Sequence, residues 1–293
     1  MQARLGGVFP PLPTSFDAAG DVDAGAIARN VARLMSTGLS GVLALGSNGE
    51  AASLDEDEAD QVLAAVRPQV PPGKLLIAGT GRESTRGTID ACRRAADLGA
   101  DAMLVRPPSY YKSQMTNDVL IAHFERVADA SPRPVLLYNL PATGVTLTLP
   151  VVSKLARHGN IVGLKETSPE LERLGQFCAI GGTFRVLTGW APVLYPAMAL
   201  GAAGGILAVA NVLPGPIVQL FEHAAAGRHA DAQALQRKLT PIAQLVSSIH
   251  GVAGLKAALD LKGFGGGPAR PPLMPVSDRV RDDISRALAD FPD

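Results

Sequence analysis

Short apolar runs alternate with longer amphipathic segments along most of the chain. Eight of the runs are apolar at successive positions, as expected of strands that are buried on both faces. These runs are 8–12, 41–45, 75–79, 102–105, 135–138, 161–165, 184–187 and 204–208. The segments with helical spacing are 24–36, 55–66, 84–98, 117–130 and 149–158. This alternation of strands and helices predicts a parallel sheet.

The repeated strand–helix pattern favours an α/β fold of the (β/α)8 type, a TIM barrel. A doubly wound open sheet is the alternative, and it requires a glycine-rich turn directly after the first strand. The segment Val8-Phe9-Pro10-Pro11-Leu12-Pro13 contains no glycine. The barrel is therefore the predicted fold.

Beyond the eighth run the pattern changes to helical segments with no strands between them. These segments are 217–226, 230–248, 252–261 and 277–289. We therefore expect a barrel with the active site over residues 1–212 and a C-terminal helical extension over residues 213–293.

Composition excludes several classes of partner. The 293 residues include 27 Lys and Arg and 27 Asp and Glu, so no net charge favours nucleic acid or an anionic membrane. We expect no membrane span and no signal peptide, and the two cysteines form no disulfide framework, which favours a cytoplasmic protein. The five histidines form no H-x-x-x-H pair, so we expect neither a metal site nor a cofactor.

Lys165 stands at the end of the apolar run Ile161-Val162-Gly163-Leu164. Burying an ammonium group is costly, and a lysine that gives up its proton is a nucleophile toward carbonyl carbon. Because side chains alternate along a strand, Ile161, Gly163 and Lys165 are predicted to share one face. This arrangement predicts Schiff-base chemistry.

Tyr138 ends the preceding strand, and functional groups of barrels lie at the C-terminal ends of strands. Neighbouring strands lie about 4.8 Å apart, so Tyr138 can serve Lys165 as a proton donor and acceptor. Taken singly, such a lysine is often a surface residue and such a tyrosine often a packing residue. Their pairing on adjacent strands favours the catalytic interpretation.

The second strand ends in Gly46-Ser47-Asn48-Gly49-Glu50. Exposed N–H groups of such a turn, with the Ser47 hydroxyl and the Asn48 amide, can bind a carboxylate. An ordinary strand-to-helix turn with Ser47 or Asn48 as a cap is the alternative. Glu50 is interpreted as structural, and Lys256, within a helical pattern, is predicted to be solvated.

Together these residues carry a family resemblance. The sequences Gly46–Glu50, Tyr110-Tyr111, Tyr138-Asn139-Leu140-Pro141 and Gly163-Leu164-Lys165-Glu166 resemble those of the pyruvate-dependent class I superfamily of dihydrodipicolinate synthase and N-acetylneuraminate lyase. The resemblance covers the chain from Val8 to about Val276. It implies a (β/α)8 barrel with a C-terminal helical extension and a homotetramer built from two tight dimers.

The resemblance also implies roles for individual residues. Lys165 would form an imine with a 2-oxo acid, typically pyruvate. Tyr138 would move the proton, in a relay with Ser47 and with Tyr111 from a neighbouring subunit. No cofactor is implied.

The carboxylate of the 2-oxo acid would lie at the Ser47-Asn48 turn. Gly189, after the seventh strand, would contribute to substrate binding. Ile206 matches a position whose backbone carbonyl faces the site.

Departures from the family pattern narrow the choice of substrate. Dihydrodipicolinate synthases carry an Arg shortly after the Tyr-Asn-x-Pro motif, whereas Pro141 is followed here by Ala142-Thr143-Gly144. Sialic-acid lyases carry acidic residues after the seventh strand, whereas Gly189 is followed by Trp190-Ala191-Pro192. The chain is most similar to 4-hydroxy-2-oxoglutarate aldolase, through the Ser-Asn variant of Gly46–Glu50 and through Pro108–Tyr111, Ala208–Leu213 and Gly251–Lys256.

The leading hypothesis is a metal-independent, Schiff-base-forming aldolase that cleaves a 4-hydroxy-2-oxo acid, such as 4-hydroxy-2-oxoglutarate, to pyruvate and an aldehyde, such as glyoxylate. The first alternative is a 4-hydroxy-tetrahydrodipicolinate synthase that condenses pyruvate with aspartate semialdehyde. The second is a non-catalytic protein that binds 2-oxo acids.

Overall fold

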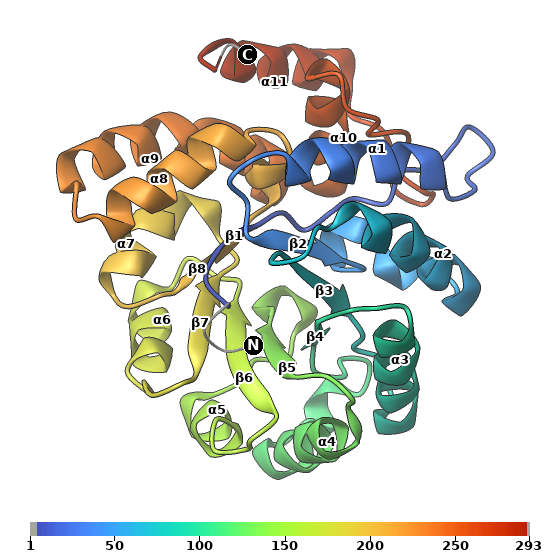
Figure 1. Cartoon of the computed structure of the whole chain (residues 1–293), viewed down its shortest axis with the longest axis vertical. Coiled ribbons are helices and arrows are strands. Elements are labelled where there is room, and N and C mark those ends of the chain that lie inside the picture. The colour runs from blue at the N-terminus through green and yellow to red at the C-terminus, as the bar shows by residue number, and fades with distance from the viewer. Residues whose placement is uncertain (1–4, 292–293) are drawn as a thin grey trace.

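Eight parallel strands form one sheet that curls into a barrel, as predicted (Figure 1). The computed structural model describes residues 5–291. The strands are β1 Gly7–Phe9, β2 Gly41–Ala44, β3 Leu75–Gly79, β4 Ala102–Val105, β5 Val135–Asn139, β6 Ile161–Glu166, β7 Arg185–Thr188 and β8 Gly204–Ile206. Their order in the sheet is β1-β8-β7-β6-β5-β4-β3-β2. The barrel closes between its two end strands through a parallel bridge from Pro11 to Leu43, where the Leu12 N–H donates to the Leu43 carbonyl at 2.8 Å.

Helices follow the strands and surround them (Figure 1). They are α1 Ala24–Met35, α2 Glu56–Val66, α3 Thr85–Asp97, α4 Asn117–Ala130, α5 Leu149–Leu155, α6 Leu171–Cys178, α7 Leu194–Ala199 and α8 Pro214–Ala225. Polar caps fix where several begin: Asp55 and Glu58 form a capping box on α2, and Thr116 accepts from the Val119 N–H on α4. The sequence did not predict α6 and α7, which are too short for a clear helical period.

Two hydrophobic layers build the core. Inside the barrel lie side chains from several strands: Phe9, Leu43, Ile77, Leu104, Leu136, Leu187 and Ile206. A second, larger layer fills the space between the strands and the surrounding helices. Because both faces of the strands are buried, apart from the exposed Arg185 that begins β7, the strands read as nearly continuous apolar runs in the sequence.

The pairing of β5 with β6 is irregular, and this corrects one prediction. Val135 pairs with Ile161, but the next residue of β5, Leu136, pairs with Gly163, so one residue of β6 is extra. Ile161 consequently packs in the outer layer and Val162 in the inner one. The predicted strict alternation of side chains along 161–165 was therefore wrong. The extra residue of a bulge shifts the alternation, so that side chains before and after it no longer follow one period of two.

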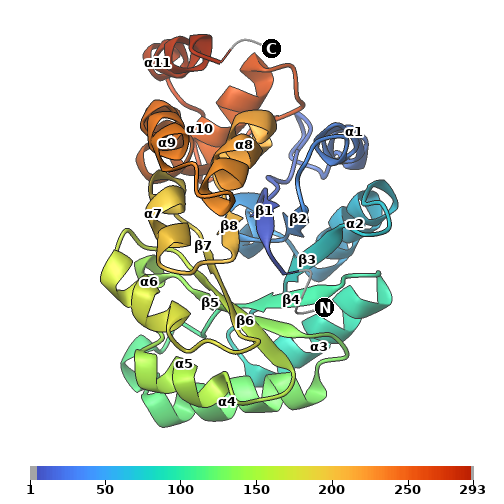
Figure 2. The ribbon, with the colours of Figure 1, turned by 60° about the vertical axis from the view of Figure 1, so that its left-hand side comes forward.

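The C-terminal extension follows α8. It contains α9 His229–Gln244, a π-helix Leu245–Ile249, α10 Gly251–Leu261 and α11 Asp278–Ala289. Both ribbon views show these helices gathered with α8 at one end of the molecule (Figures 1 and 2). The helix α8 contacts both α7 of the barrel and α9 of the extension, so these contacts do not separate the two parts of the chain. The boundary after residue 212 therefore stays a prediction. The π-helix interrupts what the sequence indicated was one continuous helix.

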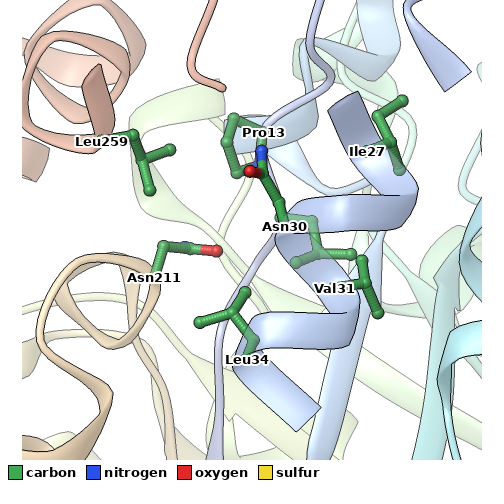
Figure 3. Close-up of a pocket in the computed structure, with 8 residues that line it drawn as sticks. Pro13, Ile27, Asn30, Val31, Leu34, Asn211 and Leu259 are labelled. Carbon is green, nitrogen blue, oxygen red and sulfur yellow. The ribbon is translucent and has the colours of Figure 1, made fainter. Parts of the chain in front are cut away.

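A small void lies where the extension meets α1 (Figure 3). It has a volume of about 10 Å³ and is lined by residues far apart in sequence, among them Leu34, Asn211 and Leu259. The Asn211 amide donates to the carbonyls of Pro11 at 2.9 Å and Ala208 at 3.0 Å, and its side chain points toward α1 in Figure 3. A void of this size is at the lower limit for one water, so it offers no room for a substrate.

Candidate active site

A cavity of about 260 Å³ lies at the C-terminal ends of the strands. This is the end at which barrels carry their functional groups. Residues at or just after the ends of six strands and residues of the extension line it: Pro11, Ser47, Asn48, Tyr138, Leu140, Lys165, Thr167, Gly189, Trp190, Ile206, Ala208, Ser247, Ser248, Gly251 and Val252. All of the predicted site residues except Tyr111 are among them.

Lys165 and Tyr138 are direct neighbours in the sheet. They pair across β5 and β6, and the Lys165 Nζ lies 4.3 Å from the centre of the Tyr138 ring. Only 4% of Lys165 and 5% of Tyr138 is exposed. The two side chains therefore present an amine and a phenol to the same enclosed space, which is the arrangement that imine formation with proton transfer requires.

Ser47 extends this pair to a third strand. Its hydroxyl oxygen lies 3.3 Å from the Tyr138 hydroxyl oxygen, so either group can donate to the other. Ser47 opens a 3₁₀ turn, Ser47–Gly49, that Gly46 enters in an extended conformation. The first N–H groups of such a turn have no partners within it, so the turn presents donors beside the cavity that Lys165 lines.

A second layer of polar groups fixes the ends of β5 and β6. The buried Asn139 amide donates to Glu166 Oε2 at 2.6 Å, and the Asn139 Oδ1 accepts from the Leu147 N–H at 2.8 Å. Arg173 pairs with the other Glu166 oxygen at 3.2 Å. Asn139 and Glu166 directly follow Tyr138 and Lys165 in the chain, so this network restrains the two residues that line the cavity.

Gly189 provides space beside Lys165. A Cβ at this position would lie 2.1 Å from Thr167 Oγ1 and 3.0 Å from Lys165 Cε. Only a residue without a side chain therefore fits between the two.

Replacing Gly189 is expected to damage the site without unfolding the barrel. In Gly189→Ala the new methyl group must displace Thr167 and Lys165, and a shift of about 1 Å in a reacting group lowers kcat/KM by roughly 10²-fold. Steady-state turnover measures this effect. Gly159→Ala is the matched control, because a Cβ there meets no atom within 4 Å. Full activity of Gly189→Ala would show that this close packing is dispensable.

Tyr111 lies outside the cavity of this chain. Its side chain is 64% exposed, that of Tyr110 is 77% exposed, and the two rings meet edge to face at 5.0 Å between centroids. A single chain therefore does not bring Tyr111 to Lys165, and the contribution from a neighbouring subunit stays a prediction.

Lys256 corrects another prediction. It was expected to be solvated, but it is 2% exposed, and its Nζ lies 2.6 Å from Glu50 Oε1. Burial lowers the pKa of Lys256 below its ordinary value, while the adjacent Glu50 carboxylate opposes that shift. The helical period indicated that the residue lies on α10, but not which neighbours cover it.

The cavity residues that were not predicted as site residues include Thr167, Trp190, Ser247 and Ser248. Thr167 lies two residues after Lys165, so the period of a strand could have found it. Trp190 lies two residues after Thr188, the last residue of β7, so the same period could have found it. Ser247 and Ser248 lie on the π-helix, and no local pattern marked them as neighbours of the barrel.

Residues 4–290 match the dihydrodipicolinate synthetase family. That match spans nearly the whole chain, including every strand and the extension. The chain belongs to this family. It is therefore a class I enzyme of the aldolase and lyase type, as the predicted barrel and the Lys165 motif indicated.

Relatives with different names are about equally similar. The chain is 36% identical to a probable mitochondrial 4-hydroxy-2-oxoglutarate aldolase of Emericella nidulans over 282 residues, covering 94% of this chain and 91% of the relative. It is also 36% identical to a 4-hydroxy-tetrahydrodipicolinate synthase of Methanothrix thermoacetophila over 289 residues, covering 96% of each. Similarity of sequence thus supports the family and leaves the substrate to be argued from the site.

A solved structure of the family has the same fold. A prophage protein of the dihydrodipicolinic acid synthase family from Escherichia coli K12, solved in complex with pyruvate, superimposes with a TM-score of 0.90 at 30% identity, covering 97% of this chain and 98% of that one. Within residues 5–291 of the present chain, no helix is long and apolar enough to cross a membrane. In the same range no three His, Cys, Asp or Glu side chains gather in a group that could hold a metal ion.

Proposed function

We propose that this enzyme is a Schiff-base-forming aldolase that cleaves a 4-hydroxy-2-oxo acid, such as 4-hydroxy-2-oxoglutarate, to pyruvate and an aldehyde, such as glyoxylate. The observation that carries the proposal is the placement of the Lys165 amine, the Tyr138 phenol and the Ser47 turn around one cavity. The pyruvate complex of the Escherichia coli relative supports the choice of the 2-oxo acid. A cytoplasmic location is part of this proposal.

The reaction begins at Lys165. Its Nζ attacks C2 of the substrate, Tyr138 donates a proton, and loss of water gives a protonated imine. The Tyr138 phenolate that remains then accepts the proton of the 4-hydroxyl group, the C3–C4 bond breaks, and the electron pair of that bond moves toward the imine nitrogen. The aldehyde leaves and an enamine remains on Lys165. Protonation at C3 and hydrolysis release pyruvate and restore the amine, and no metal is required because the imine accepts the electrons.

The remaining cavity residues bind the substrate in this scheme. The Ser47-Asn48 turn binds the carboxylate at C1, and the Ser47 hydroxyl, 3.3 Å from Tyr138, passes the proton onward. Gly189 leaves room for the imine beside Thr167. The backbone carbonyl of Ile206 faces the reacting carbon.

A second copy of the chain completes the relay. The exposed pair of Tyr110 and Tyr111 is suited to burial in an interface between subunits, where Tyr111 reaches the neighbour's Tyr138. We therefore propose a homotetramer made of two tight dimers. Light scattering gives the subunit number directly, and a monomer with full activity would contradict this part of the proposal.

The alternative enzyme is a 4-hydroxy-tetrahydrodipicolinate synthase, which the name of the Methanothrix thermoacetophila relative favours. Against it, the turn Pro141–Thr143 and Gly144 that follow β5 contain no arginine to hold a second carboxylate. A protein that binds 2-oxo acids without turnover is the remaining alternative.

Trapping with borohydride tests the proposal. Incubation with pyruvate and borohydride is expected to leave a reduced adduct on Lys165, located by peptide mass spectrometry. Pyruvate release from 4-hydroxy-2-oxoglutarate is then measured beside the condensation of pyruvate with aspartate semialdehyde. Active enzyme with unmodified Lys165 would overturn the mechanism, and faster condensation than cleavage would favour the synthase. Reversible binding of pyruvate with neither an adduct nor turnover of either substrate would identify a binding protein.

A further inference from the structure

A buried ion pair joins the barrel to the C-terminal extension directly behind the Ser47–Gly49 turn. The Glu50 and Lys256 side chains are 1% and 2% exposed, and Nζ lies 2.6 Å from Oε1. The Lys256 ammonium also donates to the Pro268 carbonyl at 2.7 Å and lies 4.5 Å from the centre of the Phe16 ring. Lys256 is thus enclosed by an anion, a carbonyl and an aromatic face.

The second carboxylate oxygen of Glu50 is bound from the extension as well. Glu50 Oε2 accepts from the backbone N–H of Arg270 at 2.8 Å. The guanidinium of Arg270 in turn donates to Glu58 on α2 at 2.6 Å and lies 4.2 Å from the centre of the Phe16 ring. Glu50 is therefore held at both oxygens by residues that lie more than 200 positions later in the chain.

The backbone of Glu50 needs this support. Its φ of 52° and ψ of 31° lie in the left-handed region, where a residue with a side chain persists only if its surroundings hold it. Glu50 ends the turn, because its N–H donates to the Ser47 carbonyl at 3.2 Å. The Thr14 hydroxyl donates to the Gly49 carbonyl at 2.6 Å from the other side. The turn beside the cavity is thus held by residues whose side chains do not themselves line the cavity.

We propose that Glu50 and Lys256 are positioning residues that hold the Ser47–Gly49 turn in the geometry that binds the C1 carboxylate of the 2-oxo acid. Neither side chain lines the cavity, so both act through Ser47 and Asn48. This inference rests on the proposed function, in which that turn is the carboxylate site. It gives the extension a role in substrate binding in addition to packing.

Glu50→Gln tests the proposal, because it removes the charge and keeps the shape. The pyruvate concentration that gives half-maximal borohydride adduct is expected to rise roughly tenfold or more, since small displacements of a binding turn are costly. The control is Asp101→Asn, which removes the carboxylate that pairs with Arg67 at 3.0 Å, in an ion pair whose side chains are each 29% exposed. Asp101 precedes β4 at the opposite end of the barrel, so Asp101→Asn is expected to lower Tm and leave the half-maximal pyruvate concentration unchanged.

A double variant separates positioning from stability. Glu50→Gln alone leaves the Lys256 ammonium buried without its counter-ion, whereas Glu50→Gln with Lys256→Met leaves no unpaired charge. If the pair positions the turn, the double variant regains Tm but still requires the raised pyruvate concentration. The proposal would be overturned if both Tm and the half-maximal pyruvate concentration of the double variant returned to their wild-type values. An unchanged half-maximal pyruvate concentration in Glu50→Gln would also overturn it. Wild-type protein that forms no adduct at any pyruvate concentration would instead refute the proposed function.

Discussion

Lys165→Ala is expected to abolish cleavage, lowering kcat by at least about 10⁴-fold, because no neighbouring group can replace a covalent amine. The variant should also form no borohydride adduct with pyruvate. Folding should be preserved, since Lys165 makes its close contact with the Tyr138 ring and not with a buried anion. Pyruvate release and intact-protein mass spectrometry measure the two effects.

The control for this variant is a lysine on the surface of the barrel. Lys154 on α5 has a side chain that is 57% exposed and lies 3.8 Å from Glu125, so Lys154→Ala should keep full activity and form the adduct. An adduct in Lys165→Ala, or turnover within tenfold of the wild type, would show that another amine carries the reaction.

Tyr138→Phe is expected to have the second-largest effect. It keeps the ring beside Lys165 and removes only the hydroxyl that lies 3.3 Å from Ser47. Loss of a positioned proton acceptor lowers kcat by roughly 10²–10⁴-fold. The C3–C4 cleavage step depends on this proton transfer more than imine formation does, so the variant should still yield a borohydride adduct.

Single-turnover measurements test that separation. The rate of adduct formation with pyruvate is compared with the rate of pyruvate release from the 4-hydroxy-2-oxo acid in the same preparation. Ser47→Ala is the companion variant, because it breaks the Ser47–Tyr138 contact and keeps the phenol. If Tyr138→Phe lowered the rate of adduct formation and the rate of pyruvate release equally, the tyrosine would act in substrate placement and not in proton transfer.

The fold was largely predictable because its strands are short, apolar and buried on both faces. All eight strands were located within a few residues of their observed bounds, and α4 matched at both ends. The bulge in β6 was not predicted, since it depends on how β5 pairs with it. The short helices α6 and α7 were missed because their local patterns are weak. The π-helix was missed because its local pattern is shared with an ordinary helix.

The site residues that lie at or just after the end of a strand could be predicted from the sequence. Ser47, Tyr138, Lys165 and Gly189 stand at or just after strand ends, and the parallel arrangement brings these ends together around one cavity. Ser247 and Ser248 could not be found in this way, because the extension must first fold across the barrel mouth.

The barrel, the family and the facing lysine and tyrosine could be inferred from the amino-acid sequence, because each depends on local periodicity or on short motifs. The environment of Lys256, which is buried against Glu50 and not solvated, depends on tertiary contacts. A helical period specifies a face of α10, whereas burial depends on which distant segments cover that face. In the same way, the Ser47–Gly49 turn is visible in the sequence, whereas the buried ion pair of Glu50 and Lys256 behind it depends on tertiary contacts.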